Sequence, residues 1–237
     1  MRRYDPHFTV PEGTDCTLDG TPASYPDYCV GPAILSPLIL GAFEARITGG
    51  AAPPRVHAAR VEAALLWFLA VSTYKESLTC TRTANDCDSS YAYYTGGEPA
   101  RGGLGLAEEI AAVDPGAHDR AWDGLLAVRC WRDLDPADVA TDLARRDLAR
   151  DQYDRAVIDG VAAIVRDRLV RLCDTDDAEL AYHFAFAQVL GRALDREASE
   201  RDPAQAAALR EELARSRPSD VDVARAVAAI DTLFECP

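Results

Sequence analysis

Two glutamates on one apolar stretch are the residues whose types and spacing point most directly to chemistry. Glu62 and Glu76 share a stripe that recurs at three- and four-residue steps in a segment predicted to be helical over about 56–79. At most about four turns separate them, so they are too far apart to share a proton or a single metal ion. Each carboxylate therefore needs its own partner, for which Arg60, Lys75 or an arginine from another helix are candidates.

Glu76 is the better candidate of the two for a functional role. The helix is apolar nearly all round between Ala63 and Val71, which predicts a central element in which both glutamates are largely buried. A buried carboxylate is either paired or functional, and structural pairing is the commoner outcome. Tyr74 adjoins Glu76, and an acidic loop follows at residues 86–88, which favours a polar site at this end of the helix.

A histidine farther along the chain offers a second chemical group. His183 follows Glu179 by four residues, so both fall on one helical stripe, where they could form an acid–base pair or bind a metal ion. A zinc-protease helix needs two histidines at this spacing, and a di-iron bundle needs Glu-x-x-His, neither of which is present. A histidine hydrogen-bonded within the core is the commoner alternative.

These residues combine into one predicted site. It lies where the first long helix meets the helix that carries His183, beneath a loop over residues 91–105. Tyrosines there line either a pocket or the core, and the core interpretation is the stronger. The predicted ligand-binding residues are Tyr74, Glu76, His183, Tyr91 and Tyr94, and the predicted metal ligands are Glu76 and His183.

Seven cysteines predict disulfide bonds and an oxidising compartment. The pair Cys16 and Cys29 and the pair Cys80 and Cys87 each enclose polar sequence, and we expect both to be bridged. No C-x-x-C is present, and no histidine stands at zinc-finger spacing from a cysteine pair. The remaining cysteines, for which the sequence leaves the pairing open, are Cys130, Cys173 and Cys236. The first two are either bridged or reduced residues of the core.

Composition restricts the class of protein. A formal net charge of −14 without a basic patch argues against nucleic acid as a partner. No apolar run reaches the length of a membrane span, and residues 1–30 lack a signal-peptide layout. The cysteines favour a periplasmic or cell-surface protein, and we therefore expect that its export signal is absent from this sequence. A membrane tether through such a removed N-terminal signal is an option.

The helical signals predict an all-α fold, a helical bundle of roughly eight helices. Five prolines make residues 1–32 an irregular N-terminal arm, and 33–237 is expected to be a single α-helical domain. A loop is expected over 86–105. The other expected helices are 37–46, 106–113, 115–132, 136–149, 153–173 and 177–200, with two more opened by Asp202-Pro203 and Pro218-Ser219-Asp220.

The order of these features resembles the imelysin-type extracytoplasmic helical proteins associated with iron uptake, over roughly residues 56–200. The segments that carry the resemblance are Phe68 to Glu76, Tyr91 to Gly97, Arg155 to Gly160 and the helix of His183. The family's Gly-x-His-x-x-Glu motif corresponds here to Ser72-Thr-Tyr-Lys-Glu76, which keeps only the glutamate. The resemblance implies an all-α bundle outside the cytoplasm and a binding function.

Three functions agree with the sequence. The first is a non-enzymatic extracytoplasmic binding protein for a metal ion or another small ligand. The second is an enzyme that uses Glu76 with His183 or a tyrosine, although no catalytic motif is present. The third is a structural or partner-binding surface protein without a ligand. No cofactor is indicated beyond a candidate metal ion.

Overall fold

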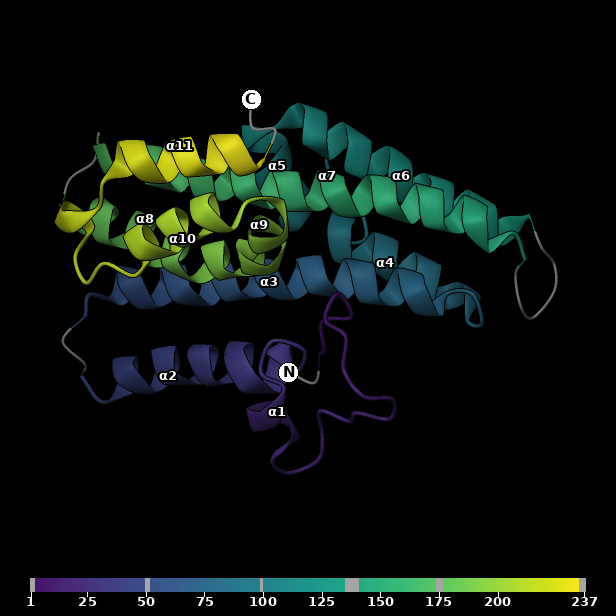
Figure 1. Ribbon diagram of the computed structural model, residues 1–237, viewed down its shortest axis with the longest axis horizontal. Coiled ribbons are helices and arrows are strands. Elements are labelled where there is room, and N and C mark those ends of the chain that lie inside the picture. The colour runs from purple at the N-terminus through teal and green to yellow at the C-terminus, as the bar shows by residue number, and fades with distance from the viewer. Residues whose placement is uncertain (1–2, 50–51, 99, 135–140, 174–176, 235–237) are drawn as a thin grey trace. The chain divides into compact units, whose positions relative to one another are not determined.

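The computed structural model describes residues 3–49, 52–98, 100–134, 141–173 and 177–234, and every regular element in these ranges is a helix (Figure 1). The all-α prediction is confirmed. The α-helices are α1 (Thr21–Ser24), α2 (Ser36–Ile47), α3 (Pro54–Thr79), α4 (Ala84–Thr95), α5 (Leu106–Val113), α6 (Pro115–Asp133), α7 (Leu143–Val170), α8 (Asp177–Leu190), α9 (Asp195–Arg201), α10 (Pro203–Leu213) and α11 (Val223–Leu233).

The expected number of about eight helices was too low, for local reasons. Helix α4 occupies part of the expected loop 86–105, because Cys87, Ser90 and Tyr94 recur at helical spacing and are buried. A 3₁₀ turn, Gly191–Leu194, separates α9 from α8, where one helix was expected. In the opposite direction, α7 is continuous through the break that we expected between 149 and 153.

The Asp-Pro signals mark helix starts as predicted where they are described. The Asp114 side chain accepts a hydrogen bond from the Ala117 amide at the start of α6, and Asp202 accepts from two amides at the start of α10. The signal at 135–136 lies outside the described residues. At the last helix, Pro218–Asp220 is a separate 3₁₀ turn, and Asp222 is the residue that caps α11.

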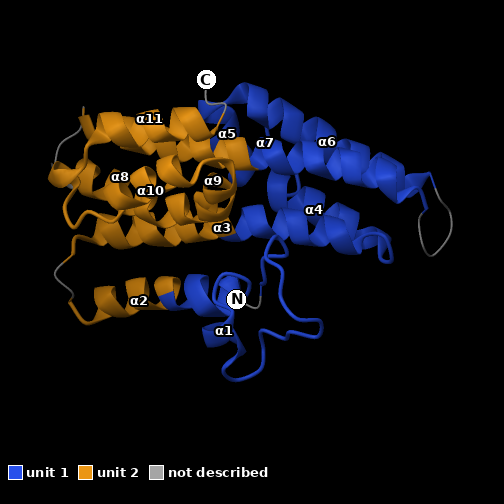
Figure 2. Ribbon diagram, viewed as in Figure 1, with its two compact units in different colours: residues 1–37, 68–157 blue, residues 38–67, 158–237 orange. Residues whose placement is uncertain are grey.

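The described chain divides into two compact units (Figure 2). Unit 1 comprises residues 1–37 and 68–157, and unit 2 comprises 38–67 and 158–237. The long helices α3 and α7 each contribute one half to each unit. The N-terminal arm therefore belongs to unit 1, and the expectation of one domain over 33–237 stays a prediction.

Unit 1 packs around the fully buried Tyr153 of α7. Its hydroxyl lies 3.4 Å from the carbonyl oxygen of Thr73 on α3, which also accepts a 2.6 Å hydrogen bond from Ser90 of α4. Helix α6 approaches α7 at Gly124, where an added Cβ would stand 2.9 Å from the backbone nitrogen of Tyr153. The glycine thus sets the distance between these two helices, since a larger residue would displace backbone.

Helix α3 is long and apolar enough to cross a membrane by length and composition alone. From the sequence, no apolar segment of that length was expected. The best window of α3 has a mean hydropathy of 1.2, and 56% of that window is buried inside the protein. A core helix meets the same criterion. The observation is therefore weak evidence for a membrane span.

Unit 2 is held at its C-terminal end by a buried carboxylate. Glu212 of α10 is fully buried and accepts hydrogen bonds from Arg215 (3.1 Å), Arg225 (2.8 Å) and the Asp222 amide (3.0 Å). Hydrogen bonds from Arg215, then from the Asp222 amide, lower the pKa of Glu212 to about 2 against the desolvation that opposes it. This network joins α10 to the start of α11.

We predict that Glu212→Gln destabilises the protein, because the amide cannot satisfy two guanidinium groups and leaves them without a buried counter-charge. The Tm should fall by roughly 5 °C at neutral pH. A group with a depressed pKa contributes stability above its ordinary pKa, so the difference from wild type should vanish as the pH falls from about 5 to about 2.

The neighbouring Glu211 provides a matched control, because it pairs with the same two arginines from a side chain that is 52% exposed. Glu211→Gln should change the Tm much less. Equal losses from the two variants would show that burial of Glu212 is not what stabilises this end of unit 2.

Candidate functional site

A group of charged and aromatic side chains in unit 1 surrounds Glu76. One oxygen of its carboxylate accepts a 2.5 Å hydrogen bond from the guanidinium of Arg3, and the other lies 3.3 Å from the ammonium of Lys75. The second terminal nitrogen of Arg3 donates to the Tyr93 hydroxyl at 3.0 Å. The guanidinium carbon lies 5.1 Å from the ring centroid of Tyr93 and 5.6 Å from that of Phe68.

Three residues from the helices surround the guanidinium of Arg3, and we call them the Glu76 socket, defined by Glu76, Tyr93 and Phe68. Only 12% of the Arg3 side chain and 11% of the Glu76 side chain are exposed. A carboxylate and a phenol oxygen contact two nitrogens of one guanidinium, and its carbon lies over two aromatic rings. Each of these interactions favours a delocalised, weakly hydrated cation.

The arm reaches the socket through backbone pairing with its own later residues. The Asp5 amide donates to the Tyr28 carbonyl at 2.7 Å, and the Gly31 amide donates to the Arg3 carbonyl at 2.8 Å. The rings of Tyr4 and Tyr28 stack at 5.0 Å. These contacts fix the backbone of Arg3 against a segment that begins beside a disulfide.

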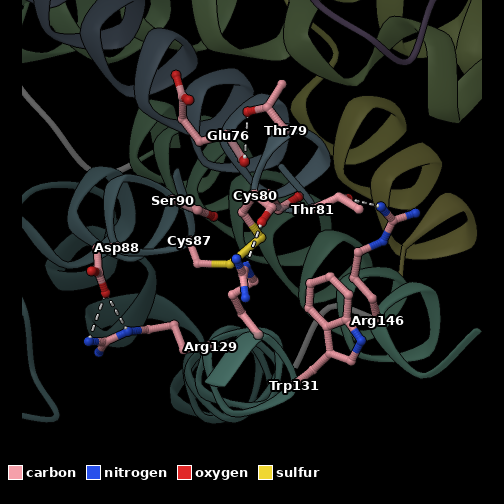
Figure 3. The surroundings of a disulfide bond; sticks show 12 residues. Glu76, Thr79, Cys80, Thr81, Cys87, Asp88, Ser90, Arg129, Trp131 and Arg146 are labelled. Atoms are coloured by element: carbon pink, nitrogen blue, oxygen red, sulfur yellow. Dashed lines mark hydrogen bonds and ion pairs between the residues drawn. A yellow bond between two sulfur atoms is a disulfide. The ribbon is translucent and has the colours of Figure 1, made fainter. Parts of the chain in front are cut away.

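That disulfide, between Cys16 and Cys29, and the one between Cys80 and Cys87 are both present, as predicted. The second joins the end of α3 to α4, and Figure 3 shows the side chains around it. The Cys80 carbonyl accepts a 3.1 Å hydrogen bond from Arg132, and Asp88 of α4 pairs with Arg129. The bridge thus holds the helix of Glu76 to the helix of Tyr93.

The arm supplies a second cation, His7. His7 is within hydrogen-bonding distance of Asp5 (2.7 Å) and of both oxygens of Asp154 on α7 (3.2 Å), and its ring stacks on Tyr74 at 3.8 Å. Arg150 lies over the same Tyr74 ring. Burial disfavours the imidazolium, but the hydrogen bonds to Asp154 and Asp5 outweigh it and raise the pKa of His7 to about 9. The ring is therefore charged at neutral pH.

The structure places four of the five predicted ligand-binding residues in unit 1 and the fifth, His183, in unit 2. Tyr74 and Glu76 belong to the clusters just described. Tyr94 is fully buried, and its hydroxyl lies 3.0 Å from Nδ1 of His118. Tyr91 donates to the Glu98 carbonyl and packs edge-to-face on Trp122. The predicted pairing of Glu76 with His183 across the two units stays a prediction.

In unit 2, His183 is buried, and burial, followed by the charges of Arg168 and Arg171, lowers its pKa. Its Nε2 atom is 3.9 Å from Glu179, which also pairs with Arg55, and its buried Nδ1 has no hydrogen-bond partner among the described residues. Within these ranges no three His, Cys, Asp or Glu side chains are grouped to hold a metal ion.

Each of the two glutamates on α3 has a partner, as expected. Glu76 is buried, but its partner comes from the N-terminal arm and from Lys75. Glu62 is only half-buried, which corrects the expectation of a largely buried side chain, and it accepts a hydrogen bond from Tyr182 within unit 2. The half-burial agrees with its place on a helix whose Leu65 is also exposed.

Sequence reasoning missed Arg3, His7, Tyr93 and Asp154 as site residues. The first two stand in proline-rich sequence that carries no helical period, so nothing local marks which helices they contact. Tyr93 lies among the tyrosines of the expected loop 91–105, and nothing in the sequence singles it out from its neighbours. Nothing in the sequence showed that residues of the arm would fill the predicted pocket. In the structure, Arg3 pairs with Glu76 and His7 pairs with Asp154.

Cys130 and Cys173 are free and exposed, so the described residues show neither of the two alternatives left open for them, a bridge or a place in the core. Each lies on the solvent side of its helix or turn, next to a buried residue, Trp131 or Leu172. Cys236 lies outside the described residues.

Comparison with protein-family models, with curated proteins and with solved structures found no match for this chain. The resemblance to imelysin-type proteins therefore stays an expectation from the sequence.

We predict that His7→Gln destabilises the attachment of the arm in a pH-dependent way. A shift of the pKa from 6.5 to about 9 corresponds to about 3 kcal/mol in favour of the charged, bound form. A raised pKa contributes stability that is complete below 6.5 and lost as the pH passes 9. Chemical denaturation should therefore show the largest difference from wild type near pH 6 and none above pH 10.

The groups that face His7 define the control. Asp5 and Asp154 supply the negative charge, and Arg150 lies over the Tyr74 ring on which His7 stacks. Asp154→Asn should therefore reproduce most of the effect of His7→Gln. A difference between wild type and His7→Gln that grows with rising pH would contradict the assignment of a charged imidazole.

Proposed function

We propose that the protein is an extracytoplasmic helical binding protein whose ligand is an organic cation held at Glu76. The observation that carries the proposal is the Glu76 socket, in which a nearly buried carboxylate, a phenol and two aromatic rings surround one guanidinium group. Aromatic rings beside a carboxylate are the usual surroundings of organic cations in binding proteins. The likeness to imelysin-type proteins supports the same class of function but names no ligand.

The donors around Glu76 favour an organic cation over a metal ion. Glu76 is the single carboxylate of the socket, and the groups beside it are a phenol, a phenyl ring and the ammonium of Lys75. A divalent metal ion would need several oxygen, nitrogen or sulfur ligands and would be repelled by Lys75. A planar cation needs only the surfaces that are present.

Binding without catalysis is supported by the contacts of these groups. Both oxygens of the Glu76 carboxylate are engaged by cationic side chains, and the His7 ring is hydrogen-bonded to two carboxylates, so neither is available to a substrate as a general base. An enzyme that uses Glu76 with His183 or a tyrosine remains the alternative, and it would require a reacting group that this cluster does not supply.

We predict a saturable, Glu76-dependent interaction with organic cations. Calorimetric titration with N-acetylarginine amide, with a primary amine of similar size and with Zn²⁺ or Mn²⁺ would separate the ligand classes. The guanidinium probe should bind in the millimolar range or better, and Glu76→Gln should weaken it by at least about tenfold, since the charged acceptor is lost.

Glu62→Gln is the matched control, because it removes a carboxylate from the same helix that contacts Tyr182 instead. It should leave binding unchanged. If no probe binds to the wild type or to Arg3→Gln, in which the internal cation is removed, the binding function is overturned. If only the metal ions bind, the ligand class is overturned.

The extracytoplasmic location is supported by the two disulfides. Peptide mapping without reduction should recover Cys16 with Cys29 and Cys80 with Cys87 after export to an oxidising compartment. Reduction should lower the Tm by roughly 5 to 10 °C per bridge, because the unfolded chain regains entropy. Free, alkylatable thiols at these four positions in the native protein would contradict an exported protein.

A partner-binding protein without a small ligand is the second candidate, favoured by the surface of α2. Leu40, Phe43 and Ile47 are 60%, 57% and 84% exposed and fall on one stripe of that helix. This function predicts no saturable binding of any of the small probes. The titration with N-acetylarginine amide therefore separates the two candidates.

A further inference from the structure

We propose that the N-terminal arm is a tethered competitor, in which Arg3 occupies a guanidinium-binding site that takes an external guanidinium group when the arm leaves. The proposal rests on the binding function assigned to Glu76 above and adds the ligand's chemical class and its regulation. The ligand is a guanidinium group, carried either by a small molecule or by an arginine side chain of a peptide.

The contacts of Arg3 are those expected of a bound ligand. Its two terminal nitrogens contact different acceptors, Glu76 at 2.5 Å and Tyr93 at 3.0 Å, an arrangement that suits the planar fork of a guanidinium. All three socket residues come from α3 and α4, whereas Arg3 comes from an irregular segment 73 residues from Glu76. The helices thus form the acceptor surface, and the arm supplies the cation.

The socket keeps its shape independently of Arg3. Phe68 and Glu76 lie on one continuous helix, and Phe68 packs edge-to-face on Tyr93 at 5.9 Å. The Cys80–Cys87 bridge joins α3 to α4 covalently. Removal of the arm would therefore leave a preorganised acceptor with one buried carboxylate, for which Lys75 at 3.3 Å is the nearby cation.

The arm is attached by discrete contacts and can separate from the socket stepwise. Residues 3–5 pair with residues 28–31 through two backbone hydrogen bonds, and His7 binds Asp154 and stacks on Tyr74. None of the His7 contacts involves the socket residues. An intramolecular ligand of this kind acts at an effective concentration of the order of millimolar, so it masks the site against dilute external ligands.

The test compares two probes and their neutral analogue. The probes are N-acetylarginine amide and an acetylated, amidated hexapeptide with the sequence of residues 3–8, and the analogue is N-acetylcitrulline amide, which has the same shape without the charge. Titrations use the full-length oxidised protein, with circular dichroism to show that each variant is folded. Stronger binding of the amide or of the hexapeptide tells which of the two sources the site prefers.

We expect Arg3→Gln to bind N-acetylarginine amide at least about tenfold more tightly than the wild type, because the internal competitor is absent. His7→Gln keeps Arg3 but loses an anchor of the arm, and it should give an intermediate gain. Combining Arg3→Gln with Glu76→Gln should abolish the gain. The citrulline analogue should bind at least tenfold more weakly than the arginine probe in every case.

Two results distinguish the failure of this inference from the failure of the binding function. If the wild type binds the arginine probe and neither Arg3→Gln nor His7→Gln binds it more tightly, the arm is no competitor, although the site exists. If neither the wild type nor any variant binds either probe, Arg3 and Glu76 form a structural ion pair, and both proposals are overturned.

Discussion

A carboxylate buried in the last turn of an apolar helix is the constraint on which the arrangement of unit 1 depends. An ionised Glu76 without a counter-charge would cost several kcal/mol, and breaking an existing buried pair typically costs about 3 to 5 kcal/mol. Lys75 alone lies at 3.3 Å and keeps 20% of its side chain in solvent. The guanidinium of Arg3 completes the pairing, and this requirement explains why a proline-rich segment without regular structure is nevertheless ordered against the helices.

Each of the two disulfides favours the pairing of Arg3 with Glu76. Cys16–Cys29 closes a loop that contains Tyr28, the backbone partner of Asp5, and ends two residues before Gly31, the backbone partner of Arg3, so the entropy lost when Arg3 docks is partly removed in advance. Cys80–Cys87 fixes the end of α3 to α4, which sets the position of Tyr93 relative to Glu76. The first bridge therefore restrains the backbone on which Arg3 docks, and the second fixes the helices that carry Glu76 and Tyr93.

The sequence predicted the parts of this arrangement that depend on local chemistry. Periodic apolar residues and Asp-Pro starts identified most helices, and the cysteine spacing identified both bridges, because each of these signals lies within a few residues. The burial of Glu76 also followed from its apolar helix. The partner did not follow, because an irregular arm has no period that would show which helix face Arg3 or His7 meets. Helix α4 was missed for a related reason, since its buried face consists of Cys87, Ser90 and Tyr94 and has little apolar signal.

The two cations of the arm, Arg3 and His7, determine whether the arm is held permanently or detaches reversibly. Arg3 and His7 are four residues apart and meet different carboxylates, so the binding of one raises the effective concentration of the other. Two such anchors make attachment stronger than either alone, which favours a permanently attached arm. Both are ionic and partly solvated at their edges, however, and an external guanidinium competes only with Arg3 while His7 still holds the arm nearby. Arg3 can then bind Glu76 again without refolding of the arm. This property distinguishes a reversible contact from a permanent structural ion pair.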